Sequence, residues 1–172
     1  PLGVGVLSAA LKKEKLDAAG YERMIATTTR LNTPGPELAA LEGVHALTDV
    51  TGFGLAGHAL ELARGSGLSL EIAWQQVPML EGVRALAQAG HITGASGRNW
   101  GGYGAEVAMP DSFAEHERAL LTDPQTSGGL LVACAPEALD EVLAVFKRHG
   151  FADAAVIGQA KPHGAGPRLV IR

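Results

Sequence analysis

The residues of this chain best suited to chemistry lie in two short segments that are polar and rich in glycine. The first segment, residues 48–55, reads TDVTGFGL and places a carboxylate, Asp49, shortly before two glycines. A strand that turns into a helix at such a corner presents a carboxylate and unpaired backbone N–H groups to the same small volume. Because Mg²⁺ usually takes one or two protein carboxylates together with phosphate oxygens and water, the corner suits a metal ion that carries phosphates.

The local sequence also allows plainer interpretations of this corner. A lone aspartate before a turn commonly caps a helix or stabilises the turn itself, and one carboxylate does not complete a nucleotide site. The segment is not a Walker loop, since no Gly-Lys-Ser/Thr follows, and it is not a dinucleotide fingerprint. Residues 52–54 therefore fit either a tight turn with Phe53 packed inward or direct contact with phosphate.

The second segment, residues 123–129, reads DPQTSGG and leads into an apolar run. Its Asp-Pro start and its Thr-Ser pair are typical of an ordinary turn, in which short polar side chains bond to local backbone. A polar loop before a buried strand is equally typical of the rim of a ligand site. Arg98 and Asn99 lie in a third, glycine-rich stretch, residues 93–104, and could hold an anion or belong to a solvated loop.

Composition excludes several classes of function. The chain has 172 residues and a formal net charge of −4, and its cations are dispersed apart from Lys12, Lys13 and Lys15. That is too little basic surface for a nucleic-acid partner. No apolar run approaches the ~20 residues that span a bilayer, and no signal-peptide pattern is present. We expect one cytoplasmic domain over residues 1–172, without nucleic acid or membrane as a partner. Because the sequence starts at Pro1 and not at methionine, we expect it to be a fragment or a processed product.

Cysteine and histidine add no chemistry to these segments. Cys134, the single cysteine, lies in an apolar run. A reactive thiol needs an electropositive and partly open setting, so we expect a buried, inert one. The six histidines lack the spacing of metal ligands, and His58 falls near the apolar face of its expected helix, where a core histidine with satisfied hydrogen bonds is expected.

The elements that position the two segments follow from hydrophobic periodicity. The pattern predicts a strand over 44–50, a helix from the glycine corner to Arg64, and a strand over 130–135. Further strands are expected at 2–7, 68–74, 154–157 and 169–171, helices at 8–15, 17–29, 36–43, 80–89, 111–121 and 136–148, and an irregular loop at 93–104. Strands and helices do not alternate strictly, and no repeat is present. The sequence therefore predicts an α+β fold, with a mixed β-sheet and helices packed against it.

The two segments together resemble a known family. Residues 48–55, followed by Gly57 and His58, and residues 123–131 resemble the C-terminal part of selenophosphate synthetase, also called selenide, water dikinase. Similar stretches at 1–7, 31–32 and 98–99 extend the resemblance over nearly the whole chain. The wider superfamily includes aminoimidazole ribonucleotide (AIR) synthetase, thiamine-monophosphate kinase and a hydrogenase-maturation enzyme. The second segment favours selenophosphate synthetase among them.

The resemblance implies a fold and an activity. An N-terminal domain would form a homodimer and hold most of the ATP site, and this chain would be the α+β C-terminal domain that closes over it. The family makes selenophosphate from selenide, ATP and water, with Mg²⁺, and releases AMP and orthophosphate. Asp49 matches the family's metal-binding aspartate. The catalytic cysteine or selenocysteine, the essential lysine and the other metal-binding aspartates belong to the N-terminal part, so we expect no catalytic residue in this chain and no activity from it alone.

The other motif residues are candidates for cofactor contact: Thr51, Asn99, Asp123, Gln125, Thr126 and Ser127. One departure from the family pattern lies just before Asn99, where residues 93–96 read TGAS instead of Pro-Gly-Gly-Thr. Ala95 tolerates positive φ less well than glycine, which puts the conformation there in question. Two alternatives stay open. One is a non-catalytic module of this fold that binds a phosphorylated ligand or a protein, and the other is a different ATP-dependent synthetase of the superfamily.

Overall fold

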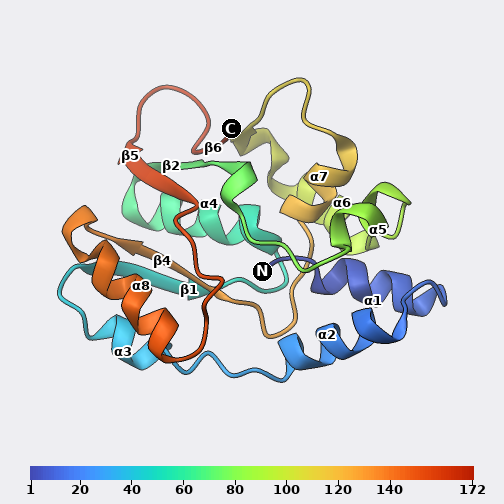
Figure 1. Ribbon diagram of the computed structural model, residues 1–172. Coiled ribbons are helices and arrows are strands. Elements are labelled where there is room, and N and C mark those ends of the chain that lie inside the picture. Colours follow the sequence, from blue (N-terminus) through green and yellow to red (C-terminus); the bar gives the residue numbers. More distant parts are fainter.

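Two β-sheets and the helices around them make up the computed structural model, which describes residues 1–172 (Figure 1). The helices are α1 Val4–Lys12, α2 Ala18–Thr28, α3 Gly35–Ala39, α4 Gly54–Ser66, α5 Val83–Gln88, α6 Gly94–Tyr103, α7 Glu115–Leu121 and α8 Leu139–Arg148. The strands are β1 Val44–Asp49, β2 Leu68–Ile72, β3 Val107–Ala108, β4 Leu130–Cys134, β5 Gly158–Pro162 and β6 Leu169–Ile171. Short 3₁₀-helices occupy Trp74–Gln76, Gly104–Glu106 and Pro136–Ala138.

The strands are divided between a small and a larger sheet. β1 and β4 form a two-stranded antiparallel sheet, and the other strands form a mixed sheet in the order β3-β6-β2-β5. In the larger sheet β6 runs parallel to both β3 and β2, whereas β5 runs antiparallel to β2. This arrangement confirms the predicted α+β class, with mixed strands and helices packed against them.

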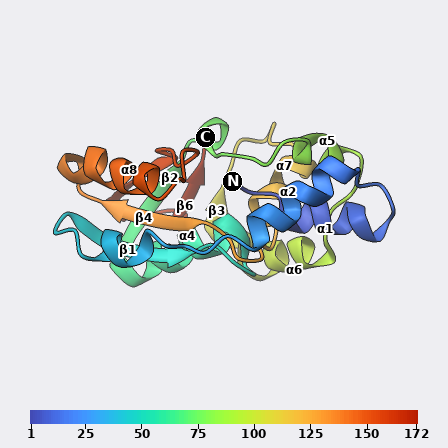
Figure 2. The same ribbon diagram turned by 60° about the horizontal axis from the view of Figure 1, so that its bottom comes forward.

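The apolar core follows the same division. The larger cluster has 20 buried residues and joins α1, α4, α5 and α7 to the larger sheet through side chains such as Leu60, Leu120 and Ile171. A smaller cluster, built on Leu38 of α3 and Val145 of α8, covers the small sheet. Figures 1 and 2 both show α3 and α8 at one end of the molecule and α1 and α2 at the other. Helix α4 packs against strands of both sheets and so fixes one relative to the other.

The register of the small sheet brings the two motif segments to one place. Asp49, the last residue of β1, lies opposite Leu130, the first residue of β4. The glycine corner follows Asp49, and residues 123–129 directly precede Leu130. Both segments therefore lie at the same end of the small sheet, where one leads into α4 and the other comes from α7.

The predicted strand at 2–7 is wrong, because α1 begins at Val4. Its N-cap residue, Gly3, has no side chain to accept a hydrogen bond. The first N–H groups of the helix bond instead to the side chains of Asp123 and Gln125, which follow 117 to 122 residues later. A cap from so distant a part of the chain leaves no signal in the local sequence, so the apolar residues at the start read as a strand.

The glycine-rich stretch 93–104 is not a loop either, since α6 occupies most of it. Thr93 caps this helix, because its side-chain oxygen accepts a hydrogen bond from the Ser96 N–H at 3.2 Å. The buried Ser96 hydroxyl donates to the carbonyl oxygen of Ala119 on α7 at 3.0 Å. Such tertiary contacts offset the low helix propensity of glycine, which is about 1 kcal/mol per residue below that of alanine. Ala95 lies within the helix and needs no positive φ.

The remaining differences concern the ends and the shortest elements. Residues 154–157 are not a strand. The strand in this part of the chain is β5, which pairs with β2 and whose residues are all exposed and carry no apolar alternation. β3 has only 2 residues, too few to show a period. Helix α7 begins after Ala114 and not at 111 or 112. None of the helices combines the length and the apolar character that crossing a bilayer requires.

Candidate functional site

The glycine corner after β1 and the loop before β4 are held together by backbone hydrogen bonds. Val50 N–H donates to the carbonyl oxygen of Gly129 at 2.9 Å, which extends the β1–β4 ladder beyond the strands. Gln125 N–H donates to the carbonyl oxygen of Thr51 at 3.0 Å. Residues 50–53 and 122–129 therefore form one structural unit, which we call the motif junction.

Close approach of the two segments explains two of their glycines. A Cβ added at Gly128 would lie 1.6 Å from the carbonyl oxygen of Val50. Gly54 has φ +70°, and a Cβ there would lie 2.6 Å from the carbonyl carbon of Thr122. Gly128 is thus required by space, and Gly54 by both space and backbone conformation. These glycines allow the corner and the loop to pack together, so phosphate contact is not needed to explain them.

Asn99 connects the same two segments from α6. Its Nδ2 donates hydrogen bonds to the carbonyl oxygens of Gly52 at 2.9 Å and Thr122 at 3.0 Å. Both hydrogens of the side-chain amide are therefore used within the protein. The structure thus shows Asn99 as a clamp on the motif junction, and its contact with a cofactor stays a prediction.

Asp123 and Gln125 turn inward and cap α1. Oδ2 of Asp123 accepts hydrogen bonds from the N–H groups of Gly5 and Val6 at 2.9 and 3.3 Å. Oε1 of Gln125 accepts those of the two preceding residues at 3.1 and 3.2 Å. These N–H groups open the helix and have no partner within it, so the two side chains satisfy them and join α1 to the motif junction.

The Asp123 carboxyl group is unusual in its surroundings. Its side chain has no exposed surface, and Oδ1 has no hydrogen-bond partner. Burial raises the pKa of this carboxyl to about 7, against the opposing effect of the hydrogen bonds from Val6, Gln125 and Gly5. Gln125 is also buried. Direct cofactor contact by either residue stays a prediction, and it would require the motif junction to open.

Thr126 and Ser127 form the exposed tip of the loop. Ser127 has φ +48°, a left-handed conformation that is unusual for a residue with a side chain. The next residue, Gly128, accepts a hydrogen bond at its carbonyl oxygen from Nδ2 of Asn32 at 2.9 Å. Asn32 was not among the predicted site residues, and its only signal was its place in a stretch similar to the family. Cofactor contact by Thr126 and Ser127 stays a prediction, which their exposure allows.

Asp49 lies exposed at the end of β1, opposite Leu130. The chain has no group of three or more His, Cys, Asp or Glu residues placed to hold a metal ion together. A single accessible carboxylate fits Mg²⁺ as one ligand among several, since the ion usually keeps water and phosphate oxygens in its shell. The residues present therefore suit a shared metal site and not a complete one.

Thr51 is held from α4 by His58. Its Oγ1 lies 3.2 Å from Nε2 of that ring, which is buried as its place on the apolar face of the helix predicts. Nδ1 of His58 lies 2.9 Å from Oε2 of Glu61, but without the alignment of a hydrogen bond, so the predicted burial is confirmed and the predicted satisfaction of both ring nitrogens is not. The histidine thus orients the side chain of Thr51, whose contact with a cofactor stays a prediction.

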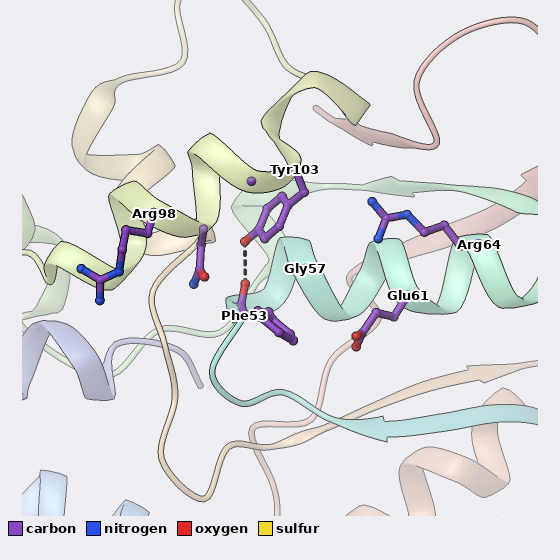
Figure 3. A pocket seen from close by; sticks show the side chains of 8 residues that line it. Phe53, Gly57, Glu61, Arg64, Arg98 and Tyr103 are labelled. Atoms are coloured by element: carbon purple, nitrogen blue, oxygen red, sulfur yellow. Dashed lines mark hydrogen bonds between the residues drawn. The ribbon is translucent and has the colours of Figure 1, made fainter.

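A hollow of about 320 Å³ opens beside the motif junction, between α4 and α6 (Figure 3). Phe53, Arg98 and Tyr103 are among the residues that line it. The Tyr103 hydroxyl donates to the carbonyl oxygen of Phe53 at 2.5 Å, and burial raises the pKa of this hydroxyl, which keeps it a donor. Phe53 is 52% exposed, so the interpretation with this ring packed inward is wrong, and the ring is a wall of the hollow instead.

Cys134 lies away from the motif junction, at the other end of β4, where it is opposite Val44. It is partly buried against the smaller core cluster. Burial raises the pKa of its thiol, which disfavours the reactive thiolate. The thiol is thus only partly buried and not fully buried as predicted, while these surroundings favour the predicted inertness, which stays a prediction.

Comparison with known proteins gives this arrangement a family. The family model described as AIR synthase related protein, C-terminal domain, matches residues 1–168, and the chain belongs to that family. Proteins named selenide, water dikinase are close relatives. The one from Burkholderia ambifaria (strain MC40-6) is 66% identical over 159 residues, which cover 92% of this chain and 45% of the relative. The one from Paraburkholderia xenovorans (strain LB400) is 64% identical, with the same coverage of 92% and 45%.

A solved structure shares the fold at lower sequence identity. The hydrogenase maturation protein HypE, solved in complex with ATP, superposes with a TM-score of 0.69 and 21% identity. The match covers 99% of this chain and 44% of that protein. This chain therefore spans less than half the length of the two dikinases and of HypE.

Proposed function

We propose that this chain is the C-terminal domain of a selenide, water dikinase, an enzyme that makes selenophosphate from selenide, ATP and water. AMP and orthophosphate are the other products. The observation that carries this proposal is the 66% identity to a protein of that name across 92% of the chain. We further propose that residues 1–172 act as one domain, because α4 and the motif junction tie the two sheets together.

The contribution of this chain to the reaction is one accessible metal ligand held in a fixed place. Asp49 supplies a carboxylate oxygen to Mg²⁺, and a preceding domain and the ATP phosphates supply the remaining ligands. Bound Mg²⁺ neutralises phosphate charge during phosphoryl transfer. Pairing with Leu130 fixes the backbone of Asp49, and the hydrogen bond from Val50 to Gly129 anchors the chain immediately after it.

The other candidate residues divide by exposure into two groups. Thr126 and Ser127 are exposed, and Thr51 is half-buried, so their hydroxyl groups are the ones we propose as hydrogen-bond donors to phosphate oxygens of ATP. Asn99 and the α1-capping pair hold the junction in shape, so their effect on the nucleotide is indirect. No side chain of this domain is proposed to act as nucleophile, acid or base.

The full-length enzyme is proposed to act in the cytoplasm as a homodimer, joined through the preceding domain. ATP and selenide are its substrates. Nucleic acid and membrane are not among its proposed partners, in line with a net charge of −4.

The test uses the full-length protein that contains this chain. Selenide-dependent formation of AMP from ATP is measured together with the amount of Mg²⁺ that gives half-maximal activity. We expect Asp49→Asn to lower kcat by at least ~100-fold or to raise the Mg²⁺ requirement strongly, because one charged ligand is lost. Asp111→Asn, a change of an exposed loop aspartate, serves as the control and should leave both values unchanged.

Two results would contradict the proposal. One is formation of ADP instead of AMP, or AMP formation that ignores selenide, which would indicate another synthetase of the superfamily. The other is ATP turnover by the 172-residue chain alone that Asp49→Asn abolishes, since the proposal places most of the ATP site outside this chain.

A further inference from the structure

One residue of the motif junction carries a fully buried carboxyl group. Asp123 has no exposed surface. Its Oδ2 accepts three hydrogen bonds, from the N–H groups of Gly5 and Val6 and from Nε2 of Gln125, at 2.9, 3.3 and 3.0 Å. Its Oδ1 accepts none. An uncharged asparagine or serine could also cap α1, whereas an aspartate here places a carboxyl group that can carry a charge in a buried setting.

The residues on either side of Asp123 contact the corner that follows Asp49. Before it, the carbonyl oxygen of Thr122 accepts a hydrogen bond from the side-chain amide of Asn99, which also donates to the carbonyl oxygen of Gly52 in the corner. After it, Gln125 N–H donates to the carbonyl oxygen of Thr51. A displacement of the Asp123 backbone is therefore transmitted to the corner by two short routes.

We infer that Asp123 is a positioning residue for this corner, and that the charge on its buried carboxyl group sets the corner's geometry. The identity of the ligand at the corner rests on the proposed function. The coupling between Asp123 and the corner is a property of this chain and does not depend on it.

Protonation has a structural consequence because the two oxygens differ. Oδ2 is already surrounded by donors, so the proton must go to Oδ1, and the resulting buried hydroxyl needs an acceptor. A Cβ on Gly5 would lie 2.3 Å from Oδ1, so the backbone of α1 closes that side and leaves the loop as the part that moves. Loss of the charge also weakens the three bonds to Oδ2, since charge-assisted hydrogen bonds are the stronger ones.

Both charge states are accessible near neutrality, because burial raises the pKa of the Asp123 carboxyl to about 7. The titratable or charged side chains on the helices around it are His58, Glu61 and Arg64 on α4, Arg98 and Tyr103 on α6, Lys12 on α1, Arg84 on α5, and Glu115, His116, Glu117 and Arg118 on α7. None of these is a source of the shift, which has only burial and three hydrogen bonds as causes. His58 needs a control, because it contacts Thr51 directly.

The test is an NMR pH titration of the 172-residue chain between pH 5 and 8.5, in a His58→Gln background and in the unchanged chain. The probes are the side-chain carboxyl carbon of Asp123 and the backbone amides of Gly5, Val6, Thr51 and Gly52. We expect the carboxyl carbon and all four amides to titrate with one shared midpoint near neutrality in both backgrounds. In Asp123→Asn the amide titrations should vanish, whereas Asp111→Asn should leave them unchanged.

Each alternative result overturns the inference. If Asp123 titrates in the ordinary aspartate range, or if Thr51 and Gly52 do not follow it, the carboxyl group caps α1 and does nothing more. If the corner amides still titrate in Asp123→Asn, another group moves the corner. Should Asp123→Asn fail to fold, the shared midpoint in the unchanged chain remains the deciding measurement. No substrate is present, so failure here is distinct from failure of the selenide-dependent AMP assay.

Discussion

Gly128→Ala is the substitution that most directly probes the contact between the two motif segments. The added Cβ would lie 1.6 Å from the carbonyl oxygen of Val50, and ordinary contact needs about twice that distance. The obstacle is backbone and not the end of a flexible side chain, so no rotamer change relieves it. The corner after β1 and the loop before β4 must therefore move apart.

The magnitude follows from what that movement breaks. Two backbone hydrogen bonds hold the segments together, Val50 to Gly129 at 2.9 Å and Gln125 to Thr51 at 3.0 Å. Each is worth about 1 kcal/mol, and overpacking adds about 1–3 kcal/mol, so we expect a loss of about 3–5 kcal/mol in the free energy of unfolding. Gly129→Ala is the matched control in the same loop, because a Cβ there meets nothing within 4 Å. Its effect should stay within about 0.5 kcal/mol.

Urea unfolding of the 172-residue chain, followed by the fluorescence of its two tryptophans, measures the difference. With a slope of about 2 kcal/mol per molar urea, the midpoint of Gly128→Ala should fall by about 2 M. In the full-length protein the same change should lower Mg²⁺-dependent activity, and Gly129→Ala should not. Equal midpoints for the two variants would refute the close packing of Gly128 against Val50 and the account of the motif junction built on it.

Three further predictions test other parts of the site. Asn99→Asp should lower the free energy of unfolding by about 2–3 kcal/mol, measured in urea. Two donated hydrogen bonds are lost, and a carboxylate would face the carbonyl oxygens of Gly52 and Thr122. An unchanged urea midpoint would show that Asn99 does not hold the motif junction together. The folded pKa of Asp123, about 7, exceeds its ordinary value of 3.8, so the native state binds more protons than the unfolded chain between these pH values. The contribution of Asp123 to the free energy of unfolding is therefore fully present below about pH 4 and is lost as the pH rises through 7, by at most about 4 kcal/mol. The urea midpoint of the unchanged chain should thus be lower at pH 8 than at pH 5, and in Asp123→Asn this difference should disappear. The pKa of Glu37 is lowered by its hydrogen bond with Arg148, so the stability that Glu37 contributes is lost as the pH falls, and only below pH 4.5. That range lies outside the comparison between pH 5 and pH 8. Tyr103→Phe should lower the free energy of unfolding by about 1 kcal/mol, because the hydrogen bond from the hydroxyl to the Phe53 carbonyl oxygen is lost. Thermal unfolding measures this change, and a gain in stability would contradict it.

The parts of the fold that were predictable from sequence are those whose signals are local. Strand β1 is a short run rich in apolar residues and helix α4 has an apolar face, and their positions at the corner are as predicted apart from the exact ends. Helix α1 was not predictable in this way, since its cap comes from Asp123 and Gln125. Helix α6 was missed because its stability comes from packing against other helices, whereas its five glycines between 93 and 104 argue locally for a loop.

The candidate site shows the same division at the level of single side chains. A polar residue in a recognisable motif is equally expected whether it contacts a ligand or holds the motif's own backbone, because both tasks need hydrogen-bonding groups at fixed positions. Sequence pattern therefore placed Asp123 and Thr126 in one group, although the first is fully buried under α1 and the second is exposed at the loop tip. Exposure and bonding partners separate them. It follows that substitutions at Asp49 and Thr126 should change ligand binding with little effect on unfolding, whereas those at Asn99 and Asp123 should change both together.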